Sequence, residues 1–219
     1  MSVTIRAAGD RAVLVQLQDL DEVLNFNDLL RGADLPTVED LVPAARTVLV
    51  RVGRGTDLGR LRETLLATYG RLPTGRTASL RADAVVIPVR YDGPDLDEVA
   101  GVCGLTPQEL ISAHTSSAYR GAFFGFAPGF CYLTGGDGRL LQVPRRATSR
   151  TRVPAGSVAL ASQFGAVYPR DSPGGWQLIG STDVCMWDTN SSPPALIQPG
   201  RRVHFVDAQD GRRPPTAQR

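Results

Sequence analysis

Lysine is absent from this chain of 219 residues, because every residue in its count of 24 lysine plus arginine is arginine. A P-loop lysine, a Schiff-base lysine and a lysine general base are therefore excluded. Any anion that a side-chain cation holds must be held by arginine, which prefers planar contacts with carboxylate or phosphate. The formal net charge of +2 is too small to indicate a nucleic-acid or membrane-surface partner.

Cysteine and histidine are scarce as well. Cys103, Cys131 and Cys185 are widely spaced and odd in number, which argues against a disulfide framework or a zinc site. His114 and His204 are the only histidines, so a three-histidine metal site is impossible. No apolar run approaches the roughly 20 residues of a membrane helix, and the first ten residues have no apolar signal core. The sequence therefore predicts a cytoplasmic protein with no metal site.

Residues 1–80 are predicted to form a small N-terminal α/β domain. Its expected elements are strands at 3–5 and 12–17, a helix opened by Asp19 and Asp21, a strand at 47–52 and a helix opened by Thr56 and Asp57. This order fits a ferredoxin-like sandwich or a variant of it.

Residues 72–81 are polar and contain Pro and Gly, which marks a domain boundary. Residues 83–207 are predicted to form a second domain that begins with a strand and two short helices, at 95–102 and 106–116. From Phe123 onward, Gly and Pro are frequent and apolar runs are short, which indicates a β-barrel or sandwich. Residues 208–219 are predicted to be a flexible tail.

An aromatic segment and an arginine loop contain residues that suit a binding site. The segment FGFAPGFCYL at 124–133 alternates aromatics with Gly and Pro, which fits either a ligand wall or an aromatic-lined barrel corner. The loop at 143–152 holds four arginines and is either an anion clamp or a solvated basic loop. It leads into Gly156 and Ser157, where amides and a hydroxyl suit an oxyanion, unless Ser157 is only a strand-edge hydroxyl.

A third segment, at 168–180, places Gly174 and Gly175 before Trp176. It fits either backbone amides held close to a ligand or a tight hairpin whose tryptophan fills the barrel. His114 lies on a predicted amphipathic helix and is either a hydrogen-bonded core residue or a group that moves a proton. A serine-hydrolase triad is excluded, because no GxSxG elbow surrounds Ser157.

In order and spacing, the runs FFGFAPGFCYL, VPRRATSRTRVPAGSVAL and YPRDSPGGWQLIGST resemble the 5-oxoprolinase B-subunit family, also named allophanate hydrolase subunit 1 or KipI. The resemblance extends over nearly the whole chain up to Val206. It implies an α+β protein in which a ferredoxin-like N-terminal domain precedes a cyclophilin-like β-barrel. It also implies ATP-dependent hydrolysis of the cyclic amide 5-oxoproline to glutamate, with ATP as co-substrate together with Mg, in a complex with the A and C subunits of that enzyme.

The matching positions imply the site residues and their roles. Three are implied to be catalytic: His114 as a proton carrier, and Arg145 and Arg150 as holders of carboxylate or phosphate. The remainder are implied to bind substrate or ATP through an apolar wall and backbone donors: Phe126, Pro128, Gly129, Phe130, Tyr132, Gly156, Ser157, Tyr168, Ser172, Pro173, Gly174, Gly175 and Trp176.

Three positions depart from the family pattern: Cys131 and Ser149 each replace a proline, and Ser181 replaces an arginine, which removes a cation near the site. An alternative function is a KipI-like inhibitor that binds a sensor histidine kinase. A peptidyl-prolyl isomerase, which the cyclophilin-like fold suggests, has no matching residues here, and a fold alone does not carry a function.

Overall fold

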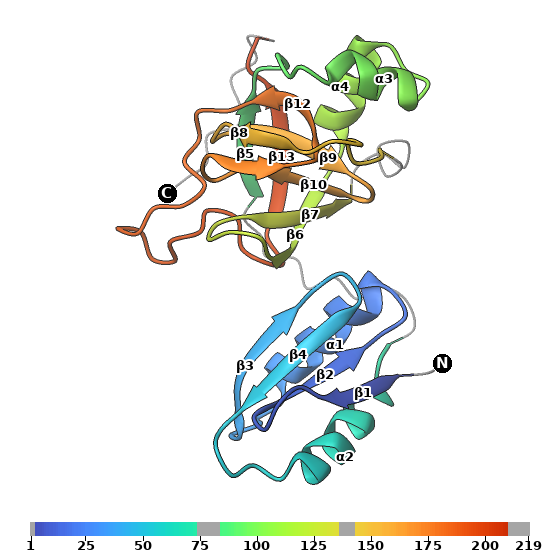
Figure 1. Ribbon diagram of the computed structural model, residues 1–219, viewed down its shortest axis with the longest axis vertical. Helices are drawn as coiled ribbons and strands as arrows, with labels where there is room; N and C mark the ends of the chain where they lie inside the picture. The colour runs from blue at the N-terminus through green and yellow to red at the C-terminus, as the bar shows by residue number, and fades with distance from the viewer. Residues whose placement is uncertain (1–2, 74–83, 136–142, 210–219) are drawn as a thin grey trace. The chain divides into compact units, whose positions relative to one another are not determined.

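The computed structural model describes residues 3–73, 84–135 and 143–209 (Figure 1). The chain divides into two compact units, Met1–Ser79 and Leu80–Arg219. The predicted tail beyond residue 209 and most of the predicted boundary segment lie outside the described residues. No helix in the described part of the chain is long and apolar enough to span a membrane.

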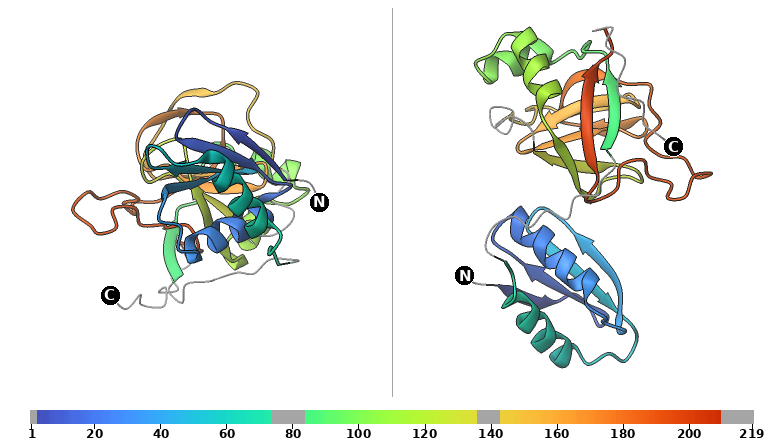
Figure 2. Two further views of the ribbon diagram at one scale, coloured as in Figure 1. Left: turned by 90° about the horizontal axis from the view of Figure 1, so that it is seen from below. Right: turned by 180° about the vertical axis from the view of Figure 1, so that it is seen from behind.

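The N-terminal unit is an antiparallel four-stranded sheet in the order β1-β2-β4-β3, with both helices on one face (Figure 2). Val48, Val50 and Val52 are fully buried beneath the helices, because alternate residues of a strand point to the same face. The elements are β1 (Thr4–Ala7), β2 (Ala12–Gln16), α1 (Leu20–Gly32), β3 (Val38–Pro43), β4 (Thr47–Val52) and α2 (Leu58–Tyr69).

Both helices of this unit begin where the sequence predicts. The Asp19 carboxylate accepts a hydrogen bond from the Glu22 N–H at 2.9 Å, and the Asp57 carboxylate accepts from the Gly59 N–H at 2.8 Å. Such N-caps satisfy amides that have no partner within the helix. The expected starts of both helices are confirmed.

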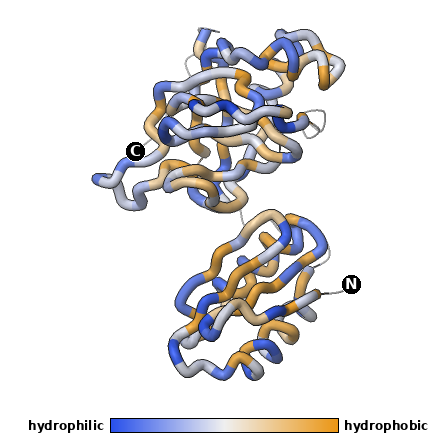
Figure 3. Tube along the Cα trace, in the orientation of Figure 1, coloured by the Kyte–Doolittle hydropathy of each residue, from blue (hydrophilic) through white to orange (hydrophobic). Residues whose placement is uncertain are grey.

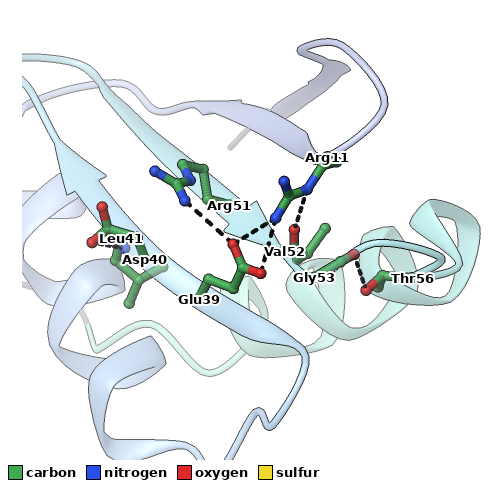
Figure 4. Close-up of polar contacts among 8 residues, drawn as sticks. All are labelled: Arg11, Glu39, Asp40, Leu41, Arg51, Val52, Gly53 and Thr56. Carbon is green, nitrogen blue, oxygen red and sulfur yellow. Dashed lines mark hydrogen bonds and ion pairs between the residues drawn. The ribbon is translucent and has the colours of Figure 1, made fainter.

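The sequence does not predict β3, because Glu39, Asp40 and Pro43 give this stretch the composition of a loop. In the structure β3 is an edge strand paired with β4, and edge strands tolerate charge and proline. Glu39 contacts Arg51 of the neighbouring strand and Arg11 (Figure 4). The element order is therefore strand-strand-helix-strand-strand-helix, and the ferredoxin-like assignment stays a prediction.

The C-terminal unit is a seven-stranded sheet that curls into a nearly closed barrel, in the order β12-β9-β10-β7-β6-β13-β5. One reciprocal pair of backbone hydrogen bonds joins its two edges: the Arg90 N–H donates to the Ser181 carbonyl at 2.8 Å, and the Ser181 N–H donates back at 2.7 Å. The strands of this sheet are β5 (Ala84–Val89), β6 (Tyr119–Phe124), β7 (Cys131–Gly135), β9 (Ser157–Ala161), β10 (Phe164–Val167), β12 (Gln177–Ser181) and β13 (Arg202–Asp207). The expected barrel is confirmed, whereas its likeness to cyclophilin stays a prediction.

Two helices and a two-stranded ribbon complete this unit. Helix α3 (Leu96–Val102) packs beside β12, and α4 (Pro107–Ser116) packs beside β13. The start of α4 is the predicted one, with Thr106 as its cap and Pro107 at its first position. The ribbon pairs β8 (Arg150–Val153) with β11 (Ser172–Gly174). Figure 3 shows hydrophobic residues along the strands of the N-terminal unit and more mixed hydropathy along the C-terminal one.

Candidate functional site

The β8–β11 ribbon brings the arginine loop beside the glycine pair. Arg150 lies opposite Gly174 in the antiparallel ribbon. The Arg146 N–H donates to the Gly175 carbonyl at 2.8 Å. Two segments that are separate in the sequence are therefore held side by side, next to Trp176.

Phe130 brings the aromatic segment to the same place. Its ring is 1% exposed and makes edge-to-face contacts with Tyr132, Tyr168 and Trp176, at centroid distances of 5.2, 5.2 and 5.5 Å. Such pairs stabilise the packing beyond the area that they bury. The residues that meet here are called the aromatic–arginine site: Phe126, Phe130, Tyr132, Arg145, Tyr168 and Trp176.

Phe126 is presented outward by an unusual backbone turn. The Ala127 N–H donates to the Gly125 carbonyl at 2.7 Å, and the φ of Phe126 between them is +64°. This is a γ-turn with positive φ, which is rare for a residue other than glycine. The ring contacts Phe130 and Tyr168 at 5.2 and 6.2 Å, yet the residue remains 58% exposed. The turn therefore places an aromatic surface in contact with solvent.

A second turn follows at once and explains the Pro-Gly pair of this segment. The Phe130 N–H donates to the Ala127 carbonyl at 2.9 Å, with Pro128 and Gly129 at the two central positions. Gly129 has a φ of +79°, which the third position of a type II turn requires. Its backbone also packs on Trp187, because an added Cβ would lie 2.8 Å from the Trp187 Cβ. Both residues thus shape the loop, with Pro128 exposed and Gly129 buried.

Arg145 supplies an exposed positive charge over the ring of Trp176. Its guanidinium carbon lies 5.8 Å from the centroid of the Trp176 ring, within the range of a cation–π interaction. Burial raises the pKa of the Tyr168 hydroxyl, and the charges of Arg145 and Arg150 oppose that rise. Among the residues that the structure describes, Arg145 has no carboxylate partner, whereas its neighbours in the loop do.

Asp95 is the partner of two of those neighbours, and the sequence marks it only as the start of a helix. Its side chain is 3% exposed, and its Oδ1 accepts hydrogen bonds from Arg146 Nη1 and Arg150 Nη2, both at 2.7 Å. Its Oδ2 accepts from the Leu178 N–H, also at 2.7 Å. Arg150, implied to hold a substrate anion, is therefore already paired with a buried carboxylate.

The glycine pair fits closely against its surroundings. An added Cβ on Gly174 would lie 2.3 Å from the Tyr168 Oη, and one on Gly175 would lie 2.9 Å from the Ser149 Oγ. Steric fit alone thus accounts for both glycines. Beside them, Ser172 is buried and its hydroxyl donates to the Arg170 carbonyl at 3.2 Å, while Pro173 is exposed.

The donors at Gly156 and Ser157 are occupied within the chain. The Gly156 N–H donates to the Tyr168 carbonyl at 2.8 Å, and the Ser157 N–H donates to the Pro154 carbonyl at 3.3 Å. The Ser157 hydroxyl also donates to Pro154, at 2.8 Å. These groups hold the turn that leads into β9, so the structure leaves the expected oxyanion role without a free donor at these two residues.

His114 lies in the apolar core and not at the aromatic–arginine site. It is 1% exposed, its ring stacks on Phe205 at a centroid distance of 4.4 Å, and its Nδ1 lies 2.8 Å from the Tyr91 hydroxyl. Burial lowers the pKa of His114 to about 3, so the imidazole is neutral at physiological pH. This environment matches the core alternative for this histidine. Across the described ranges, no cluster of three or more His, Cys, Asp or Glu side chains could hold a metal ion.

Position 181, where the resemblance expects an arginine, has a different polar contact. The Ser181 hydroxyl donates to the Asp92 carboxylate at 2.9 Å. Arg90, directly opposite Ser181 across the closure of the barrel, lies 3.9 Å from the same carboxylate and also pairs with Asp183. A cation is thus present just after the end of β5, although Asp92 and Asp183 already contact it.

The chain is similar in sequence to a protein-family model and to proteins of known name. The family model for the carboxyltransferase domain, subdomain C and D, matches residues 3–197. The B subunit of 5-oxoprolinase from Escherichia coli O157:H7 is 34% identical over 215 residues, which cover 93% of this chain and 95% of that protein. The B subunit of 5-oxoprolinase from Bacillus subtilis (strain 168) is 45% identical over 125 residues, which cover 56% of this chain and 52% of that protein.

A solved structure shares the fold. The crystal structure of TTHA0988 superposes with a TM-score of 0.72 at 34% sequence identity. The match covers 97% of this chain but 41% of that chain, so the relative is much longer than the part that corresponds to this protein.

Proposed function

Because this chain belongs to the 5-oxoprolinase B-subunit family, we propose that it is the B subunit of an ATP-dependent 5-oxoprolinase and acts together with the A and C subunits. The name of the relative that matches along nearly its whole length implies further subunits. The proposed reaction is the hydrolysis of 5-oxoproline, a cyclic amide, to glutamate with cleavage of ATP. The protein is then a cytoplasmic enzyme subunit that is inactive alone.

The observation that supports this proposal is Arg145 lying over Trp176, while the exposed ring of Phe126 contacts Phe130, which in turn contacts Trp176. The substrate 5-oxoproline carries one carboxylate on a small, nearly flat ring. A guanidinium that has no carboxylate partner among the described residues suits the carboxylate, and aromatic surfaces suit the ring. This combination matches the two halves of the substrate better than a uniformly basic loop does.

The chemistry requires activation, because water attacks an amide slowly. Transfer of the terminal phosphoryl group of ATP, with Mg as its counterion, to the lactam oxygen makes the ring carbon a better electrophile. Water then adds to that carbon and the C–N bond breaks, which frees the amino group and leaves the new carboxyl group as an acyl phosphate. A second water hydrolyses this acyl phosphate to glutamate and phosphate. In this chain, Arg145 orients the substrate through its carboxylate, and the Gly174 and Gly175 amides are the proposed donors to developing negative charge.

The decisive experiment measures ADP release with 5-oxoproline, first with this chain alone and then with the candidate A and C subunits added. We expect ATP cleavage coupled to glutamate formation only in the mixture. Coupled turnover by this chain alone would contradict its assignment as one part of a complex, and no turnover in any properly assembled mixture would contradict the proposed reaction.

The alternative function, inhibition of a sensor histidine kinase, draws support from one feature. Phe124 and Phe126 are 38% and 58% exposed and could pack against a helical partner. A direct test is the autophosphorylation rate of a sensor kinase encoded near this chain, with and without the purified protein. Inhibition that Phe126→Ser abolishes would favour this alternative.

A further inference from the structure

We propose that Asp95 is a positioning residue, which holds the arginine loop so that Arg145 is presented over Trp176 to bind the carboxylate of an anionic lactam. The inference rests on the proposed function of the same site and assigns it a residue that does not touch the substrate.

Asp95 precedes α3, where an aspartate ordinarily accepts a hydrogen bond from the first amides of the helix. Here its side chain makes no such cap bond. The carboxylate instead accepts from Arg146, Arg150 and the Leu178 N–H, each at 2.7 Å, with 3% of the side chain exposed. A buried carboxylate with three charge-assisted hydrogen bonds is held firmly in place, and it holds its donors equally firmly.

These bonds hold the arginine loop at two positions, Arg146 and Arg150. Arg150 begins β8, and Arg146 is bound twice, through its side chain to Asp95 and through its N–H to the Gly175 carbonyl. Arg145 directly precedes Arg146 in the chain, so its backbone can move little. The direction of its guanidinium toward Trp176 therefore depends on the tether that Asp95 provides.

The arginines of the loop differ in whether they have a carboxylate partner. Arg146 and Arg150 share Asp95, and Arg152 pairs with Asp171. Within the described part of the chain, this leaves Arg145 as the arginine of the loop without a carboxylate partner.

The test is a double-mutant cycle on kcat/KM for 5-oxoproline in the assembled complex, with Asp95→Asn, Arg145→Gln and the double variant. Each single variant should lower kcat/KM, and Asp95→Asn should do so about tenfold to a hundredfold, the usual cost of a misplaced binding group. Because Asp95 acts through Arg145, the double variant should match Arg145→Gln alone within about twofold. A double variant that loses the product of the two single factors would overturn the inference, and so would a normal Asp95→Asn variant.

Two further variants separate positioning from general damage. Asp171→Asn changes a carboxylate just before β11 that pairs with the exposed Arg152 and accepts from the Ala155 N–H, and it should keep kcat/KM within about twofold of the parent. Arg146→Gln breaks the tether from the loop side and should lower kcat/KM less than Asp95→Asn. If Asp95→Asn fails to fold, Arg146→Gln replaces it as the test variant. A normal kcat/KM for Arg146→Gln would then contradict the positioning role of Asp95.

A spectroscopic measurement keeps this inference separate from the proposed reaction. In a Trp187→Phe background, Trp176 is the only tryptophan, and a guanidinium over its ring changes its fluorescence. Asp95→Asn should change the emission of the folded chain in the same direction as Arg145→Gln. If the parent complex does not turn over 5-oxoproline, the proposed function fails while this result still decides the tether. Unchanged emission in Asp95→Asn, with changed emission in Arg145→Gln, would overturn the inference alone.

Discussion

Two carboxylates, one in each unit of the chain, each hold a pair of arginines. Glu39, on an edge strand of the N-terminal unit, contacts Arg11 and Arg51 at 2.9 and 3.3 Å, and its side chain is 39% exposed (Figure 4). Asp95, in the C-terminal unit, contacts its two arginines at 2.7 Å and is 3% exposed. The groups are alike, but water screens the first cluster and is excluded from the carboxylate of the second.

The two units also differ in their aromatic residues and in their unusual backbone features. Phe26 and Tyr69 are the only aromatic residues in the sequence of the N-terminal unit, whose core is otherwise aliphatic. The C-terminal unit contains the aromatic–arginine site, a positive-φ phenylalanine and glycines packed against side chains. Regular patterning thus builds a scaffold in one unit, while the other concentrates the unusual features that suit binding.

The largest expected effect is on activity. Arg145→Ala should lower the rate of the assembled complex at least about a hundredfold, since loss of one charged contact with a transition state costs about 2–4 kcal/mol. The matched control is Arg51→Ala, which removes an exposed arginine from the Glu39 cluster and should leave the rate within about twofold. The measurement is ADP release at saturating ATP. A near-normal rate for Arg145→Ala would show that Arg145 does not bind the substrate.

A second prediction concerns the stability of the C-terminal unit. Asp95→Asn should lower its free energy of unfolding by about 2–3 kcal/mol, because two arginines lose their charged partner in a buried setting. Trp176 and Trp187 both lie in this unit, so tryptophan fluorescence during urea unfolding reports on it specifically. A loss below about 0.5 kcal/mol would mean that burial does not strengthen this cluster.

Two glycines extend the comparison to packing. Gly174→Ala should lower the free energy of unfolding by about 1–3 kcal/mol, because the added methyl group meets the Tyr168 hydroxyl. Gly32→Ala, at the end of α1, has no atom within 4 Å of the new Cβ and should instead stabilise the N-terminal unit by up to about 1 kcal/mol. Fluorescence follows the first variant and circular dichroism the second. Equal effects would show that the two units are packed alike at these glycines.

The pH dependence of stability should come partly from His114. The unfolded chain binds a proton at this imidazole below about pH 6.5, but the folded chain does so only near about 3, because burial lowers the pKa. Stability is therefore lost as the pH falls through this window, by at most about 1.4 kcal/mol per pH unit. His114→Phe should flatten that slope, although it gives up the hydrogen bond to Tyr91. His204→Gln keeps His114 and is the control; an unchanged slope in His114→Phe would contradict the assignment.

The sequence predicts those parts of the molecule whose cause is local. Alternate valines identify β4, and Asp19, Asp57 and Thr106 mark the starts of three helices, because caps and periodicity act over a few residues. The sequence does not predict β3, because β3 is a strand through its pairing with β4 and not through its composition.

The candidate site divides in the same way. Residue types alone single out Arg145 and Trp176, and the structure places them together. The partner of Arg146 and Arg150 could not be found from the sequence. Asp95 lies 51 and 55 residues before them, and its position at the start of α3 makes it resemble an ordinary helix N-cap. His114 shows the opposite case, in which a chemically versatile residue proves to be buried in the core. Long-range pairing and burial, which no local pattern encodes, decide such roles.

The smallest expected effect belongs to Glu39, and it is the sharpest test of the opening comparison. Glu39→Gln should lower the stability of the N-terminal unit by no more than about 1 kcal/mol, because exposed ion pairs gain little over their hydrated state. Hydrogen exchange of β3 and β4 amides measures the change locally. At about 1 M salt, where the screening length is about 3 Å, the difference from the parent should nearly vanish. The loss in Asp95→Asn should persist at that salt concentration, so equal salt sensitivity in the two variants would show that exposure does not distinguish the two clusters.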